Sequence, residues 1–125
     1  IFNNGDFEND LYRDFTYIDD IVEGIVRLID HPPVEDVPSA VFNIGNNNPE
    51  KLMVFIGTLE KCLSKSLNRD VIFDKVFEPI KPGDVPATYA STDLLQKAVG
   101  FKPKTSIEEG LQQFTDWYVD YYNVK

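Results

Sequence analysis

Two cations, Arg13 and Lys81, lie where an anionic ligand could reach them on an otherwise acidic chain. The 125 residues include 12 basic and 21 acidic side chains, which gives a net charge of −9. A diphosphate would therefore need local cations in order to bind. The Arg13 guanidinium presents a rigid fork of N–H donors that a lysine ammonium does not imitate. The structural alternative for Arg13 is a salt bridge to Asp10 or Asp14.

Arg13 stands immediately before a predicted strand and helix. Residues 14–18 alternate polar and apolar side chains, which is typical of a half-buried strand. Asp19 and Asp20 are then good helix N-caps, and Asp20 has capping-box spacing with the glutamate three positions later. Apolar residues continue at helical period until Pro32-Pro33. We expect the two aspartates to cap this helix rather than to catalyse.

The remaining sequence predicts further helices and short strands. Strands are expected at 40–44, where continuous hydrophobicity indicates burial on both faces, and less regularly at 70–77. Helices are expected from Asn48-Pro49, over 92–99 with Gly100 at the C-terminal end, and from a capping box formed by Ser106 and Glu109. An ordered loop is expected where prolines and a glycine cluster at 79–86. The pattern indicates a mixed α/β fold.

Composition narrows the functional class. Hydrophobic and charged fractions of 42% and 26% are those of an ordinary globular protein. The sequence has no apolar run of membrane-spanning length and no basic stripe suited to nucleic acid. The single Cys62 forms no internal disulfide, which fits a reducing cytosol, and we interpret it as an inert core residue. We expect His31 to cap a helix end.

Four blocks of the sequence resemble, in the same order, motifs of the nucleotide-sugar epimerases of the extended short-chain dehydrogenase/reductase superfamily. The nearest resemblance is to UDP-glucuronate 4-epimerases. The blocks are Arg13–Gly24, Val41–Asn46, Lys81–Ala90 and Gly100–Ser106. The resemblance implies an α/β fold that is the C-terminal part of such an enzyme. Residues 40–45 would be the last strand of a Rossmann dinucleotide-binding domain, and the rest a small mixed α/β substrate-binding lobe. We therefore expect 1–125 to be a single fragment of a longer protein.

The resemblance implies that four residues bind the UDP-sugar. Arg13 would contact the diphosphate, Lys81 would lie near a phosphate, and Asp84 would lie near the ribose, whose two hydroxyls suit a carboxylate acceptor. Asn43 could reach the nucleotide from the end of its strand. Lys81 replaces the Gln or Arg that is usual in relatives. For Lys81 and Asp84 the alternative is exposed charge in a turn held by Pro and Gly, and for Asn43 it is satisfaction of the strand end.

An NAD-dependent parent enzyme is also implied, in which hydride leaves C4 of the sugar for NAD and returns to the opposite face. The sequence lacks the glycine-rich turn that holds the cofactor pyrophosphate, because its seven glycines are never spaced G-x-G-x-x-G or G-x-x-G-x-x-G. Tyr121-x-x-x-Lys125 matches the catalytic Tyr-x-x-x-Lys only formally, since that pair lies in the first half of the family's enzymes. We therefore assign no catalytic residue and no metal ligand here, and we predict that the chain alone neither holds NAD nor epimerises.

The identity of the reaction stays open at this stage. UDP-glucuronate decarboxylases and nucleotide-sugar dehydratases share the Arg-Asp-Phe motif, and a non-catalytic binding module is the alternative from another class. Residues Glu8–Leu11 are interpreted as a small loop insertion that leaves the substrate in doubt. The expected setting is cytoplasmic synthesis of capsule or cell-surface polysaccharide precursors, with a UDP-sugar but no nucleic acid or membrane as partner. The parent is expected to dimerise through helices upstream of this chain.

Overall fold

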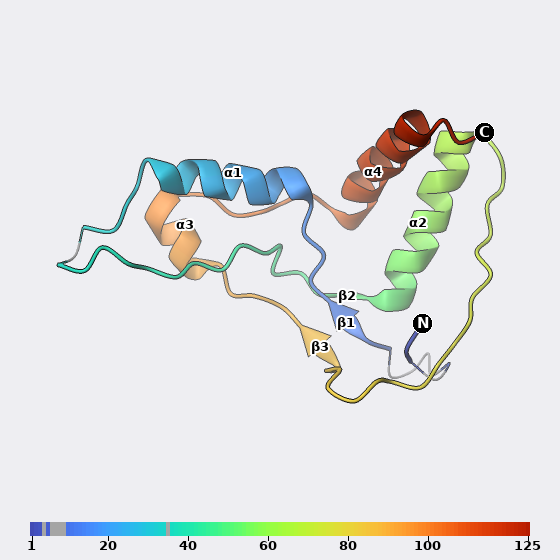
Figure 1. Ribbon diagram of the computed structural model, residues 1–125, viewed down its shortest axis with the longest axis horizontal. Helices are drawn as coiled ribbons and strands as arrows, with labels where there is room; N and C mark the ends of the chain where they lie inside the picture. The colour runs from blue at the N-terminus through green and yellow to red at the C-terminus, as the bar shows by residue number, and fades with distance from the viewer. Residues whose placement is uncertain (4, 6–9, 35) are drawn as a thin grey trace. The chain divides into compact units, whose positions relative to one another are not determined.

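A computed structural model describes residues 1–3, 5, 10–34 and 36–125, in which helices predominate over very short strands (Figure 1). The elements in chain order are β1 (Tyr12–Arg13), α1 (Ile18–Ile29), β2 (Glu50–Lys51), α2 (Leu52–Leu67), β3 (Ala87–Thr88), α3 (Asp93–Val99) and α4 (Ile107–Tyr122). The chain divides into two compact units. The first comprises 1–13, 50–88 and 106–125, and the second comprises 14–49 and 89–105. The expected mixed α/β class is confirmed.

The sheet of the first unit places Arg13 on its central strand. Its strand order is β2-β1-β3, with β1 antiparallel to β2 and parallel to β3. Arg13 is paired with Glu50 on one side and with Thr88 on the other. The Tyr12 N–H donates to the Pro86 carbonyl at 2.8 Å and extends the pairing toward the 81–86 loop. Residues far apart in the sequence are thereby brought together around β1.

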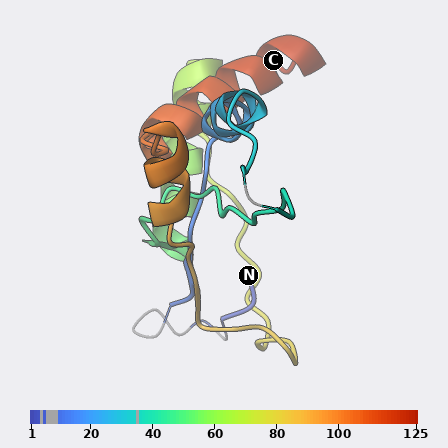
Figure 2. The same cartoon turned by 90° about the vertical axis from the view of Figure 1, so that its left-hand side faces the viewer.

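The core of the first unit lies between α2 and α4, which contact each other; Figure 1 shows them side by side, and in Figure 2 the red α4 crosses in front of the green α2. Cys62 and Leu111 are buried there. Thr115, only 1% exposed, hydrogen-bonds to Ser66 between the hydroxyl oxygens at 3.0 Å. Burial raises the pKa of the Cys62 thiol, as expected for the inert core cysteine that the sequence predicted.

Local signals at the ends of α3 and α4 are confirmed. Gly100 ends α3 with a φ of +63° in the left-handed region, and its N–H donates to the Gln96 carbonyl at 2.9 Å. Ser106 is the N-cap of α4, and its hydroxyl accepts from the Glu109 N–H at 3.1 Å. The ring Nδ1 of His31 lies 2.9 Å from the Arg27 carbonyl, consistent with the helix-end role predicted for it.

In the second unit α1 packs against α3. Gly24 is buried on α1, where an added Cβ would lie 3.2 Å from Ile44 Cδ1 and 3.5 Å from the Phe101 ring. The Arg27 guanidinium lies over that same ring, 5.0 Å from its centroid. Glycine is therefore the residue that lets these apolar side chains approach the helix backbone.

The predicted capping roles of Asp19 and Asp20 are wrong. Helix α1 begins at Ile18, and its N-cap position, Tyr17, makes no side-chain cap. Asp20 is buried inside the first turn, and its Oδ2 accepts the backbone N–H groups of Lys104 at 3.2 Å and Thr105 at 2.9 Å. Because the helix starts two residues earlier, Asp20 lies within its first turn and not at the N-cap, and its side chain binds amides more than eighty positions away instead.

The predicted start of α2 is also wrong. Asn48 and Pro49 precede β2, and the helix begins only at Leu52, after an N-cap residue, Lys51, that makes no side-chain cap. The Asp10 carboxylate takes that role instead, because its Oδ2 accepts the Met53 N–H at 2.8 Å. A residue 43 positions away thus stabilises the helix end, which a search for a local cap does not detect.

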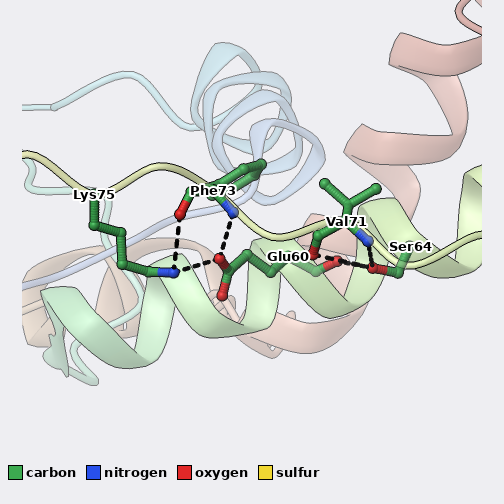
Figure 3. A network of polar contacts seen from close by, with 5 residues as sticks. All are labelled: Glu60, Ser64, Val71, Phe73 and Lys75. Carbon is green, nitrogen blue, oxygen red and sulfur yellow. Dashed lines mark hydrogen bonds and ion pairs between the residues drawn. The ribbon is translucent and has the colours of Figure 1, made fainter.

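The strand predicted at 70–77 does not form; this segment is held by side chains of α2 (Figure 3). Ser64 Oγ accepts the Val71 N–H at 2.9 Å, and Glu60 Oε1 accepts the Phe73 N–H at 2.7 Å. Glu60 also forms an ion pair with Lys75. The amides of 71 and 73 that a neighbouring strand would bind are therefore bound by a helix.

The strands predicted at 14–18 and 40–44 are likewise absent. Segment 14–16 is attached by side chains rather than by a backbone ladder: Thr16 Oγ1 accepts the Asn46 N–H at 3.1 Å. Val41 is 84% exposed, so the expected burial of 40–44 on both faces is wrong for this chain. The assignment of 40–45 to the last strand of a dinucleotide-binding domain stays a prediction. Among the described residues no helix is long and apolar enough to cross a membrane.

Candidate functional site

The Arg13 side chain is held from three directions within the first unit. Its Nη1 donates to the Tyr12 carbonyl at 2.8 Å and to the Val85 carbonyl at 2.9 Å, and its Nη2 donates to Asp84 Oδ1 at 3.1 Å. The side chain is 25% exposed. These bonds occupy three of the five N–H donors of a guanidinium. The Nε hydrogen and one Nη2 hydrogen have no partner among residues that the structure describes.

The salt bridges considered as alternatives for Arg13 are not formed. Asp10 binds the N-terminus of α2, and Asp14 binds backbone amides of the second unit. The partner of Arg13 is Asp84, 71 positions later in the chain. The structure thus brings together two of the four predicted site residues, although they come from different sequence blocks.

The loop that presents Asp84 has the form expected from its sequence. The Asp84 N–H donates to the Lys81 carbonyl at 3.1 Å, and Gly83 has a φ of +92°. Pro at the second position, a positive φ at the third and this closing hydrogen bond are features of a type II turn. An L-residue at 83 would be strained, so the glycine serves the turn. Residues 87–88 then form β3 beside Arg13.

The Lys81 ammonium is directed away from the Arg13–Asp84 pair, toward Glu78 and Phe2. Its ammonium lies 3.2 Å from Glu78 Oε2 and 5.0 Å from the centroid of the Phe2 ring, and the side chain is 57% exposed. An exposed pair of this kind is weak and can exchange its partner at small cost. Lys81 therefore lies in the same turn as Asp84, but its ion pair is with Glu78 and not with Asp84.

Asn43 belongs to the second unit and is exposed. Its side-chain amide donates to the Ser91 carbonyl at 3.4 Å, at the long limit of such a bond. The structural role weighed for Asn43, satisfaction of a strand end, assumed a strand that is not formed here. Its predicted contact with a nucleotide stays a prediction.

Asp14 organises the second unit in a way that the sequence did not reveal. Its carboxylate accepts the N–H groups of Asn47 at 3.0 Å, Asn48 at 3.3 Å and Ala90 at 3.4 Å. A Cβ on Gly45 would lie only 2.8 Å from Asp14 Oδ2, so glycine is required for this approach. The available signal was an aspartate directly after Arg13, but its partners are set by the fold.

The Tyr121-x-x-x-Lys125 match is interrupted by the end of a helix. Helix α4 ends at Tyr122, and Asn123 follows with a φ of +49° in the left-handed region. Lys125 lies beyond that break, where its carbonyl accepts a hydrogen bond from Arg69 at 3.0 Å. The i, i+4 relationship that a helix would provide is therefore lost. In the described part of the chain no group of His, Cys, Asp and Glu is arranged to hold a metal ion.

Comparison with protein families identifies residues 3–114 as matching the model described as GDP-mannose 4,6 dehydratase. Protein CapI of Staphylococcus aureus is 38% identical over 98% of this chain and 38% of its own length. A probable UDP-glucuronate 4-epimerase of Rhizobium meliloti is 40% identical over 92% of this chain and 36% of its own. The chain thus spans less than two fifths of the length of these relatives.

A solved structure agrees with these sequence relatives. The UDP-glucuronic acid 4-epimerase of Bacillus cereus, in complex with UDP-glucuronic acid and NAD, is 26% identical with a TM-score of 0.74. The match covers 98% of this chain and 35% of that one. The fold of nearly the whole chain therefore recurs within a larger epimerase.

Proposed function

The chain belongs to the GDP-mannose 4,6 dehydratase family, and from this premise we propose that it is the nucleotide-sugar-binding part of an NAD-dependent UDP-sugar 4-epimerase. The proposed reaction converts UDP-glucuronate to UDP-galacturonate, for capsule or cell-surface polysaccharide precursors. The relatives named for UDP-glucuronate 4-epimerisation support this substrate. A cytoplasmic location and a homodimeric complete enzyme belong to the same proposal.

The Arg13–Asp84 pair is the observation that most directly supports a nucleotide-binding site, and we call this pair the nucleotide clamp. Three N–H donors of Arg13 bind Tyr12, Val85 and Asp84, which orients the guanidinium plane before any ligand arrives. The two remaining donors are the ones proposed to bind the diphosphate. Charge-assisted bonds from a planar guanidinium suit phosphate oxygens geometrically as well as electrostatically.

The other three residues take complementary roles in this proposal. Asp84 uses Oδ1 for Arg13, which leaves Oδ2 to accept ribose hydroxyls. Lys81 exchanges Glu78 for a phosphate and adds positive charge to a chain whose net charge is −9. Asn43, whose side chain is exposed, is proposed as a further contact to the nucleotide through its side-chain amide.

The residues of this chain do not fit NAD. A pyrophosphate needs a close turn of glycines ahead of a helix N-terminus, and no glycines in the sequence have that spacing. The space beside Gly24 and Gly45 is filled by the protein's own side chains and not left open for a ligand. An added Cβ would lie 3.2 Å from Ile44 at Gly24 and 2.8 Å from Asp14 at Gly45. We propose that NAD binds to other parts of the complete enzyme.

A nucleotide-sugar dehydratase is the second candidate, because the matching family model is itself described as a dehydratase. UDP-glucuronate decarboxylation is a third chemistry that would use the same clamp. The three reactions bind one kind of ligand and differ in what happens to the sugar, so the clamp alone does not separate them.

Product analysis of the complete enzyme tests the proposal. The enzyme is incubated with UDP-glucuronate and NAD, and the product is identified by mass and by NMR of the sugar ring. An epimer of unchanged mass supports the proposal. Loss of carbon dioxide or of water identifies a decarboxylase or a dehydratase. Binding of UDP without turnover of any UDP-sugar would instead support a non-catalytic binding module.

A further inference from the structure

We infer that Asp10 is a positioning residue for Arg13, and that it acts by anchoring β1 to the N-terminus of α2. This inference rests on the proposed function, in which Arg13 binds the nucleotide. Asp10 lies three positions before Arg13, in a stretch of sequence interpreted above as a loop insertion. Asp10 is only 4% exposed, which is unusual for an aspartate unless its carboxylate is fully hydrogen-bonded.

The hydrogen bonds of Asp10 join three segments of the first unit. Oδ1 accepts the Asn3 side-chain amide at 3.2 Å and the Leu11 N–H at 2.9 Å, and Oδ2 accepts the Met53 N–H at 2.8 Å. Asn3 is itself only 1% exposed. Each carboxylate oxygen therefore has a donor, and none of its partners among the described residues is a cation.

Asp10 also supplies what α2 lacks. The first turn of α2 contains no acidic residue, and its N-cap residue Lys51 makes no side-chain cap. The Met53 N–H is one of the amides that a helix leaves without an internal partner, and a negative charge is favourable at this end of the helix. The Leu52 N–H donates to the Leu11 carbonyl at 2.8 Å, so residues 10 and 11 bind two successive amides of the helix.

Asp10 and Arg13 belong to the same short stretch of backbone, so fixing the position of Asp10 also fixes the position of Arg13. Two residues after Leu11 the chain reaches Arg13, which is paired with Glu50 of β2, the strand that ends immediately before α2 begins. The guanidinium is held by the carbonyls of Tyr12 and Val85, so a shift of β1 changes the direction of its free N–H donors. A displacement of about 1 Å in a positioned group can cost as much as roughly a hundredfold in function.

Asp10→Asn is the direct test, because it replaces one acceptor oxygen with an NH2 group and removes the charge. UDP is titrated calorimetrically into the complete enzyme carrying Asp10→Asn, Arg13→Ala, or both. We expect Asp10→Asn to weaken UDP binding about tenfold in the otherwise unchanged enzyme. In the Arg13→Ala background we expect less than about a twofold further loss, because the group that Asp10 positions is gone.

Asp20→Asn is the matched control. Asp20 is also buried and also binds two backbone amides, but in the second unit. We expect it to lower the melting temperature by an amount similar to Asp10→Asn while leaving the affinity for UDP unchanged. If Asp10→Asn does not fold, Asp10→Glu replaces it, since the longer side chain keeps the charge but moves the carboxylate.

Three results would overturn the inference. They are wild-type affinity in the Asp10 variant, an equal loss in both Arg13 backgrounds, and an equal loss of affinity in Asp20→Asn. Each leaves the proposed function intact, provided that Arg13→Ala itself weakens binding. Wild-type affinity in a folded Arg13→Ala enzyme would instead contradict the proposed nucleotide clamp, and the role of Asp10 with it.

Discussion

Arg13 and Asp84 form an ion pair, with Nη2 and Oδ1 3.1 Å apart, although 71 positions separate them in the chain. Each partner is also held locally: Arg13 by the Tyr12 carbonyl, and Asp84 by the turn hydrogen bond to Lys81. The pair therefore joins β1 to the loop that leads into β3. Because the Arg13 guanidinium is already oriented before a ligand binds, less entropy is lost on binding. We therefore expect Arg13 to make the strongest contact with the nucleotide.

Replacing Arg13 with alanine in the complete enzyme should weaken UDP binding by roughly 10- to 150-fold, because charge-assisted hydrogen bonds contribute about 1.5–3 kcal/mol. Arg13→Lys should recover only part of this loss, since the ammonium keeps the charge without the planar fork. Calorimetric titration measures the affinity, and a thermal melt checks folding. Unchanged affinity in a folded Arg13→Ala enzyme would show that the ion pair with Asp84 is purely structural.

Lys81→Ala should weaken UDP binding less than Arg13→Ala, by less than about tenfold, because an exposed flexible cation loses entropy when it is fixed. Glu78→Gln is the matched variant: it removes the partner of Lys81 and should leave the affinity unchanged or slightly higher. The same titration compares the two. A larger loss for Lys81→Ala than for Arg13→Ala would reverse the proposed order of the two cations.

The 125-residue chain by itself should neither epimerise UDP-glucuronate nor retain NAD, because its sequence lacks a glycine-rich turn and its Tyr121 and Lys125 are separated by a helix end. Chromatography of the reaction mixture and fluorescence titration with NADH measure the two properties. Formation of UDP-galacturonate by the purified chain would contradict the prediction.

Glu60→Gln should loosen the segment that Glu60 attaches to α2, which amide hydrogen exchange would detect as faster exchange at Phe73 (Figure 3). The hydrogen bond from Lys75, followed by that from the Phe73 N–H, lowers the pKa of the Glu60 carboxyl from its ordinary 4.5. A lowered folded pKa stabilises the fold above the ordinary value and loses that effect as pH falls through the lowered one.

Urea unfolding between pH 5 and pH 3 measures this contribution, and the Glu60→Gln variant should show a shallower loss of stability over that range. Ser64→Ala is the control, since it removes the acceptor of the Val71 amide and leaves Phe73 unaffected. Identical pH dependence in wild type and Glu60→Gln would show that the ion pair with Lys75 contributes nothing to folding.

Cys62 should react slowly with thiol reagents in the folded chain and readily after unfolding. Its pKa is raised above the ordinary 9.0, chiefly by burial. The folded state then keeps its proton at a pH where the unfolded thiol has lost it, so the free energy of unfolding should fall as pH rises above about 9. Cys62→Ala should flatten that decline, and rapid labelling of the folded chain at neutral pH would contradict the assigned burial.

Local chemistry was enough to predict several elements from the sequence. The Ser106–Glu109 cap, the Gly100 helix end and the Pro82-Gly83 turn depend on hydrogen bonds between residues three or four positions apart. The motif order also pointed to the family that the comparisons identify. These features are readable because each donor and its acceptor lie within one short stretch of sequence.

The tertiary structure decided which groups the aspartates bind. Asp10 and Asp14 were alternatives as ion-pair partners of Arg13, and Asp20 was expected to cap a helix. Each instead accepts a backbone N–H group that lies more than thirty positions away. The strand expected at 70–77 failed for a related reason. An extended segment becomes a strand only when another strand meets its amides, and here the amides of Val71 and Phe73 are bound by side chains of α2.

The partner of Arg13 shows the same division between sequence and structure. Its residue type and motif indicated an anion-binding cation. In the folded chain its ion pair is with Asp84 and not with Asp10 or Asp14, which lie near it in sequence. Residue type determines which bonds a side chain can make, and that is a property of the sequence. Which donor and acceptor meet depends on bringing segments together from across the chain, and only the tertiary structure does that.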